Sequence, residues 1–243
     1  MSEYLNGGRA QDDAELRWGL GDVAIGIFAS LFLSLLIGGT IMSVAGWKSS
    51  EEAPIWGLAL LQIPLWVGYL GAVLFAGSKG RGIVADFGFR MRALDAPLGL
   101  ALGIFCQLAL LPLIYAPIFY FTGKNTDELA RPAEQLAARA DGNLSWALFA
   151  LLVGILAPVV EELFYRGLLL RSLEKRRLPV WAAVLVSSVV FAGMHMQALQ
   201  FPGLLLVGLI AGTLAAVTGR LGASIWLHIG FNMTTVVLLF MHR

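Results

Sequence analysis

The sequence predicts an all-α protein, a polytopic bundle of about seven transmembrane helices, and its composition and its apolar stretches lead to this prediction. Apolar residues make up 58% of the 243-residue chain, whereas charged residues make up only 14%. Soluble domains contain about 25% charged residues. The mean hydropathy of +0.78 agrees with a membrane location. A soluble protein with a large core would need a polar surface that this composition cannot supply.

Seven apolar stretches are candidates for membrane spans, since about 20 helical residues cross the hydrocarbon core of a bilayer. They lie at about 23–46, 55–77, 97–121, 145–170, 180–197, 202–218 and 222–241. The sixth stretch is short and the seventh follows it closely, so six or eight spans also fit the sequence. Four tryptophans at the proposed ends are typical of the membrane interface, namely Trp47, Trp56, Trp146 and Trp181.

The first 22 residues are polar, and their acidic residues do not fit the basic start of a cleaved signal peptide. We therefore expect a cytoplasmic N-terminal tail at 1–22, an uncleaved signal-anchor helix, and a single transmembrane domain at 23–243. The loop charges agree with an N-terminus inside the cell membrane. Eleven Lys and Arg residues fall on the side of the N-terminus, against five on the opposite side, and such residues are enriched in cytoplasmic loops.

The loops and the net charge indicate which partners to expect. The longest loop, 124–142, carries apolar residues at helical spacing among charged ones, which predicts a short helix on the membrane surface. Two glycine pairs, Gly99 with Gly103 and Gly208 with Gly212, predict close helix packing in lipid. The net charge is +1 and no basic stripe is present, which argues against a nucleic-acid partner.

The fourth stretch carries three ionisable residues, and each costs about 3 kcal/mol or more to place inside a span. Glu162 and Arg166 are four residues apart, so they share one face of an α-helix and can pair. Glu161 is rotated by about 100° from Glu162 and points elsewhere. We therefore expect Glu161 to have no partner on its own helix, which suits a general base or acid.

Two further stretches bring polar side chains into the bundle. The fifth contains Phe191 and His195, and the seventh contains His228 and Asn232, each pair four residues apart. A single histidine or asparagine in a span is more often a packing element than a functional group. Four uncompensated polar groups on three spans are hard to explain by packing, so we favour function. Counted from the cytoplasmic ends, Glu161, His228 and His195 should lie at roughly 15, 10 and 24 Å, a mismatch that the sequence does not explain.

These residues resemble the three motifs of the CAAX-protease and bacteriocin-processing intramembrane endopeptidases, also called the abortive-infection family. The motifs are E-E-x-x-x-R, F-x-x-x-H and H-x-x-x-N in this order, and here they run from Glu161 to Arg166, from Phe191 to His195 and from His228 to Asn232. The resemblance covers about 145–241, the expected catalytic core. It implies hydrolysis of a peptide bond in a membrane-associated protein or peptide; eukaryotic members cut prenylated proteins.

Two chemistries remain open for such a site. In the first, which we favour, Glu161 and His195 hold and deprotonate a water, while His228 and Asn232 donate to the oxyanion. Glu162, Arg166 and Phe191 then support the site. In the second, Glu161, His195 and His228 bind zinc, which activates the water. Asn is an uncommon zinc ligand, and the chain has no H-E-x-x-H motif, so we favour a glutamate protease without a cofactor.

Two other classes of function compete with the protease. A non-catalytic membrane scaffold of the same fold is one, because the family includes members thought to act without cleavage. A proton-coupled transporter is the other, since Glu and His within spans also serve as proton relays. The intact motif set disfavours the scaffold, and the lack of an inverted repeat disfavours the transporter.

Overall fold

The structure is a computed structural model that describes residues 17–242, and every regular element in that range is a helix. Six helices are long and apolar enough to cross a membrane. They are Leu20–Ala45, Ile55–Ser78, Asp95–Thr122, Gly142–Lys175, Phe201–Thr218 and Gly222–Met241. A seventh apolar helix, Val180–Met194, is shorter. The predicted all-α polytopic bundle is confirmed, with an apolar helix at each of the seven predicted positions.

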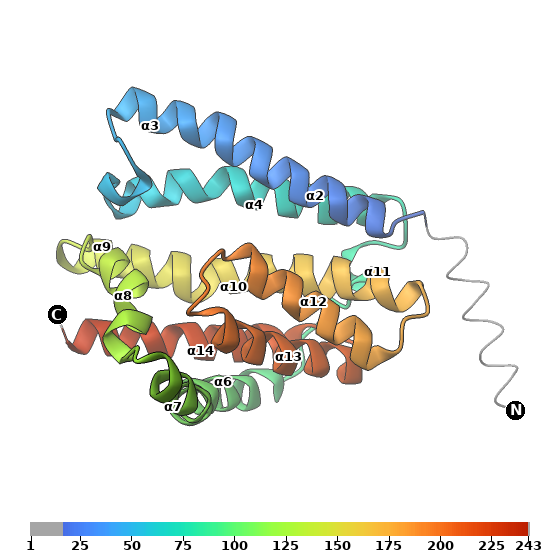
Figure 1. Ribbon diagram of the computed structural model, residues 1–243. Helices are drawn as coiled ribbons and strands as arrows, with labels where there is room; N and C mark the ends of the chain where they lie inside the picture. The colour runs from blue at the N-terminus through green and yellow to red at the C-terminus, as the bar shows by residue number, and fades with distance from the viewer. Residues whose placement is uncertain (1–16, 243) are drawn as a thin grey trace, which may run out of the picture.

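The first two spans form a pair that covers one side of the bundle (Figure 1). Its elements are α2 (Leu20–Leu33), the π-helix η1 (Ser34–Gly38), α3 (Gly39–Ala45), the 3₁₀ turn η2 (Ser50–Glu52) and α4 (Ile55–Ser78). The two helices touch through their backbones, because a Cβ atom on Gly68 would lie 2.4 Å from the backbone of Ser30. Trp47 and Trp56 meet at the α3–α4 end with ring centroids 5.6 Å apart, which suits the predicted interfacial position.

The third span continues into the predicted surface helix. Its elements are the short α5 (Ile83–Asp86), then α6 (Asp95–Phe105), the π-helix η3 (Cys106–Leu110), α7 (Leu111–Thr122) and α8 (Thr126–Ala137). The prediction of a helix within 124–142 is confirmed by α8, whose first turn is capped by the side chain of Asn125, 2.9 Å from the Glu128 amide. The predicted close packing is also present, since a Cβ atom on Gly103 would lie 2.1 Å from the Leu227 carbonyl of α14.

The remaining elements carry all the motif residues. They are α9 (Gly142–Phe149), the π-helices η4 (Ala150–Leu156) and η5 (Glu162–Leu169) with α10 (Ala157–Glu161) between them, α11 (Leu170–Lys175), α12 (Val180–Met194), α13 (Phe201–Thr218) and α14 (Gly222–Met241). The segment from α9 to α11 is one continuous helix of 34 residues. It lies between the α2–α4 pair and the layer of α13, α14 and α6 (Figure 1). Its second half, Glu162–Leu170, is buried, whereas Leu151 and Ile155 of its first half are exposed.

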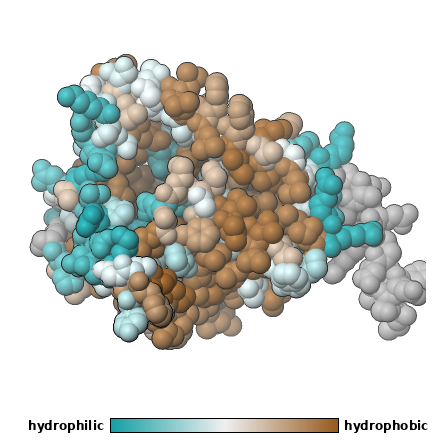
Figure 2. All heavy atoms as spheres, in the orientation of Figure 1, coloured by the Kyte–Doolittle hydropathy of each residue, from teal (hydrophilic) through white to brown (hydrophobic). Residues whose placement is uncertain are grey.

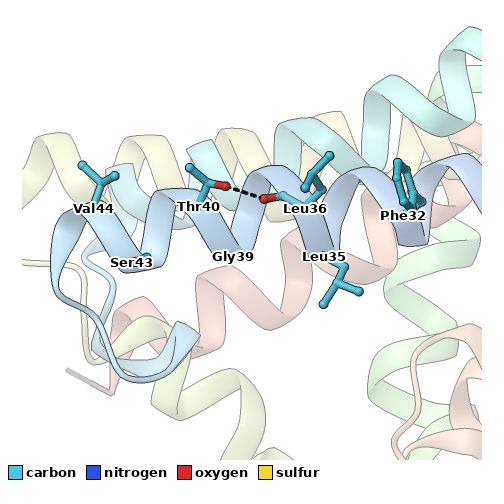
Figure 3. Close-up of a pocket in the computed structure, with 7 residues that line it drawn as sticks. All are labelled: Phe32, Leu35, Leu36, Gly39, Thr40, Ser43 and Val44. Atoms are coloured by element: carbon cyan, nitrogen blue, oxygen red, sulfur yellow. Dashed lines mark hydrogen bonds between the residues drawn. The ribbon is translucent and has the colours of Figure 1, made fainter.

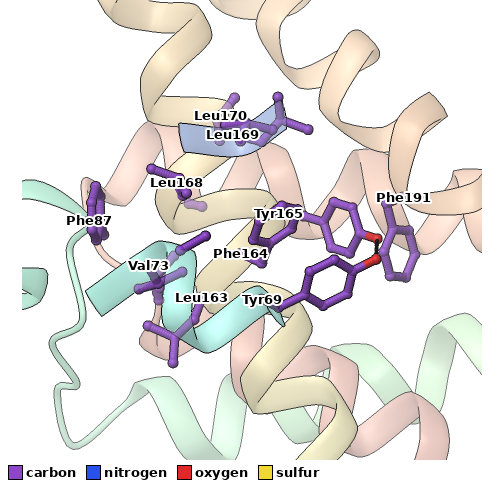
Figure 4. Close-up of a cluster of buried hydrophobic side chains, with 14 of the residues drawn as sticks. Tyr69, Val73, Phe87, Leu163, Phe164, Tyr165, Leu168, Leu169, Leu170 and Phe191 are labelled. Carbon is purple, nitrogen blue, oxygen red and sulfur yellow. Dashed lines mark hydrogen bonds between the residues drawn. The ribbon is translucent and has the colours of Figure 1, made fainter. Parts of the chain in front are cut away.

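Aromatic side chains fill the space between the second and fourth spans (Figure 4). Tyr69 of α4 stacks on Phe164 with ring centroids 4.2 Å apart, and its hydroxyl lies 2.8 Å from the hydroxyl of Tyr165. Tyr165 in turn meets the edge of Phe191 at 5.3 Å. This buried aromatic row connects the α2–α4 pair to the helix that carries His195, so it fixes the distance between the two halves of the bundle.

Hydrophilic residues gather at both ends of the bundle, and a belt of apolar residues lies between them (Figure 2). The predicted tail at 1–22 lies mainly outside the described residues, but its last part does not form a free tail. Trp18 is buried against Phe87, with ring centroids 5.0 Å apart, and Asp22 is buried in an ion pair with Lys79. The first helix therefore begins at Leu20, three residues earlier than expected, because these side chains anchor it.

A shallow apolar groove of about 440 Å³ lies on the outer face of the first span (Figure 3). It is lined by Phe32, Leu35, Leu36, Gly39, Thr40, Ser43 and Val44. The hydroxyl of Thr40 is already satisfied, because it donates to the Leu36 carbonyl at 2.7 Å. The groove contains none of the predicted site residues, so it is a feature of the apolar outer surface.

Lys and Arg residues cluster at the end of the bundle where α4 and α11 end, and this clustering predicts the orientation of the protein in the membrane. We expect this basic end to lie in the cytoplasm. In a variant with Cys106 changed to Ala, we expect a membrane-impermeant thiol reagent to label Gln135→Cys of α8 from the extracytoplasmic side and Arg176→Cys from the cytoplasmic side. Both positions are exposed. The measurement uses sealed vesicles of known orientation. If each cysteine is labelled from the side opposite to the expected one, the predicted orientation of the protein is wrong.

Candidate active site

The fourth span supplies the acidic part of the site, and it is not a regular α-helix there. Residues Glu162–Leu169 form the π-helix η5, which follows directly on α10. A π-helix makes i→i+5 hydrogen bonds, adds a residue to the turn and is frequent at functional sites. The assumption of α-helical geometry is therefore wrong at Glu162, although the pairing that it predicted is present. The wider turn still places residues four apart close together.

Glu162 and Arg166 form an ion pair that is completely shielded from solvent. The Nη1 atom of Arg166 lies 2.9 Å from Oε1 of Glu162, and both side chains have 0% exposure. Arg166 has two further contacts on other helices. Its Nη2 atom donates to the Gly208 carbonyl of α13 at 3.2 Å, and its guanidinium lies 4.4 Å from the ring centroid of Phe191 on α12. One arginine thus holds three spans together.

Gly208 makes this contact geometrically feasible. A Cβ atom at this position would lie 3.3 Å from Nη2 of Arg166 and 3.0 Å from the side chain of Ser188 on α12. A side chain at this position would therefore crowd both the guanidinium of Arg166 and Ser188. The glycine pair that predicts helix packing has this additional consequence, which the sequence pattern alone did not indicate.

His228 of α14 lies between the two neighbouring glutamates. Its Nδ1 atom is 3.0 Å from Oε1 of Glu162, and its Nε2 atom is 3.7 Å from Oε2 of Glu161. The expectation that Glu161 has no partner is therefore corrected: its partner comes from another helix. Glu162 is fully buried, whereas the Glu161 side chain is 15% exposed. The carboxylate of Glu161 is consequently open to its surroundings, whereas that of Glu162 is sealed.

His195 joins the group through an aromatic ring rather than by a direct bond. It caps the C-terminal end of α12, where its Nδ1 atom lies 2.8 Å from the Phe191 carbonyl. The ring of Phe191 meets His195 at 4.9 Å and His228 at 5.5 Å between centroids, both edge to face. The two histidines thus flank one phenylalanine. The expected mismatch in depth between the two histidines is therefore absent, because both rings contact the same side chain, although α12 begins at Val180 as predicted.

Asn232 lies one turn beyond His228 and binds the backbone of the fourth span. Its Nδ2 atom donates to the Val153 carbonyl of η4 at 2.8 Å. An amide nitrogen has two N–H donors, so one remains for another acceptor. The expectation of four uncompensated polar groups is thus wrong in detail, because each group has a contact. Asn232 also connects α14 to η4, a structural role that sequence analysis had allowed for.

Tyr69 and Tyr165 are the neighbours of this site that sequence reasoning missed. Both are buried, and they contact the site through Phe191 and through each other. A signal was available for Tyr165, which lies four residues after Glu161 within the first motif. Tyr69 gave a weaker signal, as a single hydroxyl-bearing residue in the middle of the second span.

The proposed zinc ligands do not form a preassembled cluster. Within residues 17–242, no three His, Cys, Asp or Glu side chains come together in a way that could hold a metal ion. Glu161 and His228 are close, but His195 is separated from them by Phe191.

The segment that carries the motif residues is similar to known proteins. Residues 143–234 match the family model described as type II CAAX prenyl endopeptidase Rce1-like. This segment contains every motif residue. A protein of Escherichia coli, described as an uncharacterised 24.3 kDa protein, is 34% identical over 119 residues, which cover 46% of this chain and 54% of that protein. The match thus spans about half the length of this curated relative. No solved structure matches the chain.

The buried ion pair generates a prediction about folding. We expect Arg166→Ala to destabilise the protein by about 3–5 kcal/mol, because it leaves the charge of Glu162 buried and without its cation. A double change, Glu162→Gln with Arg166→Leu, should recover part of the folded protein, since it removes both charges. The measurement is the fraction of folded, detergent-extracted protein during thermal unfolding.

A matched control is available at the basic end of the same helix. Arg171 pairs with Glu174 at 2.7 Å but is partly exposed, so Arg171→Ala should cost about 1 kcal/mol or less. If the double variant is no more stable than Arg166→Ala, the pairing of Glu162 with Arg166 does not control folding.

Proposed function

We propose that the chain is an intramembrane endopeptidase of the type II CAAX prenyl endopeptidase Rce1-like family, whose model its residues 143–234 match. The proposed reaction is hydrolysis of a peptide bond in a membrane-associated protein or peptide. One observation supports it most directly. A partly exposed carboxylate, Glu161, lies 3.7 Å from an imidazole, His228, inside an apolar bundle.

Activation of water is assigned to Glu161 together with His195. Glu161 is the partly exposed member of the glutamate pair, so a water molecule can reach it, whereas Glu162 is sealed and occupied by Arg166. A general base must lie within hydrogen-bond reach of the proton that it removes. Nδ1 of His195 is taken up by the Phe191 carbonyl, so Nε2 is the atom left to hold the water. The water then attacks the substrate carbonyl as Glu161 takes its proton.

Stabilisation of the resulting oxyanion is assigned to His228 and Asn232. When Nδ1–H of His228 donates to Glu162, Nε2 is the remaining site on the ring. A proton at Nε2 produces an imidazolium between two carboxylates and a charged donor for the oxyanion. The free N–H of Asn232 is the second donor. Preorganised donors of this kind are worth about 10²–10³-fold in rate each.

Glu162, Arg166 and Phe191 act as positioning residues in this scheme. Glu162 orients the ring of His228, much as a carboxylate orients a metal-bound or catalytic histidine. Arg166 pairs with Glu162, and Phe191 sets the spacing of the two histidines. Collapse of the tetrahedral intermediate breaks the C–N bond. The proton taken by Glu161 then passes to the leaving amine, which balances the reaction.

The central prediction concerns catalysis. We expect Glu161→Ala, His195→Ala and His228→Ala each to lower cleavage by at least about 100-fold while the protein still inserts and folds, since each removes a group acting on the reacting atoms. A farnesylated peptide with a C-terminal CAAX sequence is one probe. A second measurement compares the protein termini in membranes of cells that carry the wild type or Glu161→Ala.

The matched control is Glu134→Ala, which removes an exposed carboxylate of α8 and should leave turnover unchanged. Near-normal turnover by purified Glu161→Ala protein would refute the catalytic assignment. If no protein terminus depends on Glu161, a non-catalytic scaffold of the same fold becomes the better description. Proton-driven solute uptake that depends on Glu161 would instead support the transporter.

A further prediction separates the two chemistries of water activation. If Glu161 and His195 activate water without a metal, strong chelators should leave turnover unchanged, and purified protein should contain no stoichiometric zinc. We expect this result. Elemental analysis that finds about one zinc per chain, lost in His195→Ala and in His228→Ala, would establish the metal mechanism and keep the protease assignment.

A further inference from the structure

The end of the bundle where α4 and α11 end carries more cations than carboxylates among residues 17–242. Each acidic side chain at this end is already bound by a cation of its own. The ion pairs are Asp22–Lys79, Asp86–Arg81, Glu174–Arg171 and Asp95–Arg220. Four exposed arginines of the same end form no ion pair within the described range. They are a first pair, Arg90 and Arg92, and a second pair, Arg176 and Arg177, and we call them the basic rim.

Contacts between the loops place the two arginine pairs at one end of the protein. The Nζ atom of Lys175, which directly precedes the second pair, donates to the Trp18 carbonyl at 2.7 Å. The ring of Trp18 in turn meets the edge of Phe87, three residues before Arg90, with centroids 5.0 Å apart. Figure 1 shows that α11 ends on the side of the bundle where α2 begins. The basic rim is therefore one surface feature made by two loops.

Arg177 has a backbone conformation that L-residues adopt only at a cost. Its φ is 61°, in the left-handed region where glycine is the usual residue. It closes α11 in the common pattern of a helix C-terminus, because its amide bonds to the Glu174 carbonyl at 2.8 Å and the Leu178 amide bonds to the Leu173 carbonyl at 3.3 Å. The backbone would thus favour glycine. The arginine side chain is exposed and makes no hydrogen bond within residues 17–242, so the described fold gives no reason for it.

Exposed apolar side chains accompany both arginine pairs. Met91 lies within the first pair and Leu94, 67% exposed, follows it; Val180 and Trp181, the latter 72% exposed, follow the second pair. Trp181 is also one of the tryptophans predicted at the membrane interface. A soluble anionic partner would leave these apolar groups in water. The headgroup layer of a bilayer instead offers phosphate to the guanidinium groups and hydrocarbon to their apolar neighbours.

We propose that the basic rim binds the headgroups of anionic phospholipids, with Arg176 and Arg177 at its centre. A guanidinium can form two parallel hydrogen bonds to one phosphate, which makes arginine well suited to this ligand. Each arginine near an anionic membrane surface is worth about fivefold in binding. Because α11 is the end of the fourth helix, a lipid bound there holds the end of the helix that carries Glu161 and Glu162. The inference depends neither on the proposed protease function nor on the orientation in the membrane.

The first experiment compares two lipids on the full-length protein in detergent. We expect phosphatidylglycerol to bind at least about tenfold more tightly than phosphatidylcholine. The double change Arg176→Gln with Arg177→Gln should weaken the binding of phosphatidylglycerol at least about tenfold and leave that of phosphatidylcholine unchanged. The measurement is the dissociation constant of each lipid.

The matched control removes two exposed cations at the opposite end of the bundle, by Lys124→Gln with Arg131→Gln. This double variant should keep the preference of the wild type for phosphatidylglycerol. An equal loss in both double variants would show a general effect of net charge and overturn the proposal. Unchanged binding in the Arg176→Gln, Arg177→Gln variant would overturn it as well.

A third arm separates a lipid headgroup from a free phosphate. Inorganic phosphate should displace phosphatidylglycerol no better than chloride does at the same ionic strength, because it offers nothing to the apolar neighbours of the arginines. Displacement by inorganic phosphate alone would assign the basic rim to a small soluble anion and overturn the lipid assignment.

The last experiment uses the backbone of Arg177. In phosphatidylcholine, Arg177→Gly should unfold at the same temperature as the wild type or at a higher one, since glycine adopts the left-handed conformation without cost. Its affinity for phosphatidylglycerol should nevertheless fall about fivefold, whereas Arg177→Lys, which keeps the charge, should retain most of it. A lower unfolding temperature of Arg177→Gly in phosphatidylcholine would show that the side chain supports the fold and would overturn its assignment to lipid binding.

Discussion

A fully buried carboxylate inside an apolar bundle needs compensating donors, and in this protein the carboxylate of Glu162 sets the arrangement of the helices around it. Its Oε1 atom is shared by Arg166 at 2.9 Å and by His228 at 3.0 Å. Desolvation of an unpaired charge would cost several kcal/mol, so loss of either contact is unfavourable. The fourth span and α14 are consequently held at hydrogen-bonding distance at this level, and the position of His228 follows.

Arg166 transmits the same constraint to two more helices. It binds the Gly208 carbonyl of α13 and lies over the ring of Phe191 on α12. These contacts determine where α12 sits, and therefore where its C-terminal residue His195 lies. A charge pair that looks purely structural thus places both histidines of the candidate site. This explains how polar residues can be retained in a bundle for their geometric effect even where a hydrophobic pair would be more stable.

The candidate site combines fully buried residues with exposed ones. Glu162, Arg166 and Phe191 have 0% exposure, whereas Glu161 and the turn after His195 are open. Buried residues held by several contacts suit the positioning of donors, since preorganisation avoids a reorganisation cost during the reaction. Open residues suit the entry of water and of a peptide chain. The boundary between the two runs between Glu161 and Glu162, neighbours in the sequence whose side chains have different surroundings.

The sequence by itself determined the fold class, the number of apolar helices and the identity of the charged pair, because hydropathy and the cost of buried charge act locally along the chain. It could not determine how Glu161 is paired, because its partner His228 is 67 residues away and reaches it only through packing. It also missed the π-helix at Glu162 and the early end of α12 at Met194. Those features depend on how the side chains of several helices pack against one another, and only the tertiary structure determines this packing.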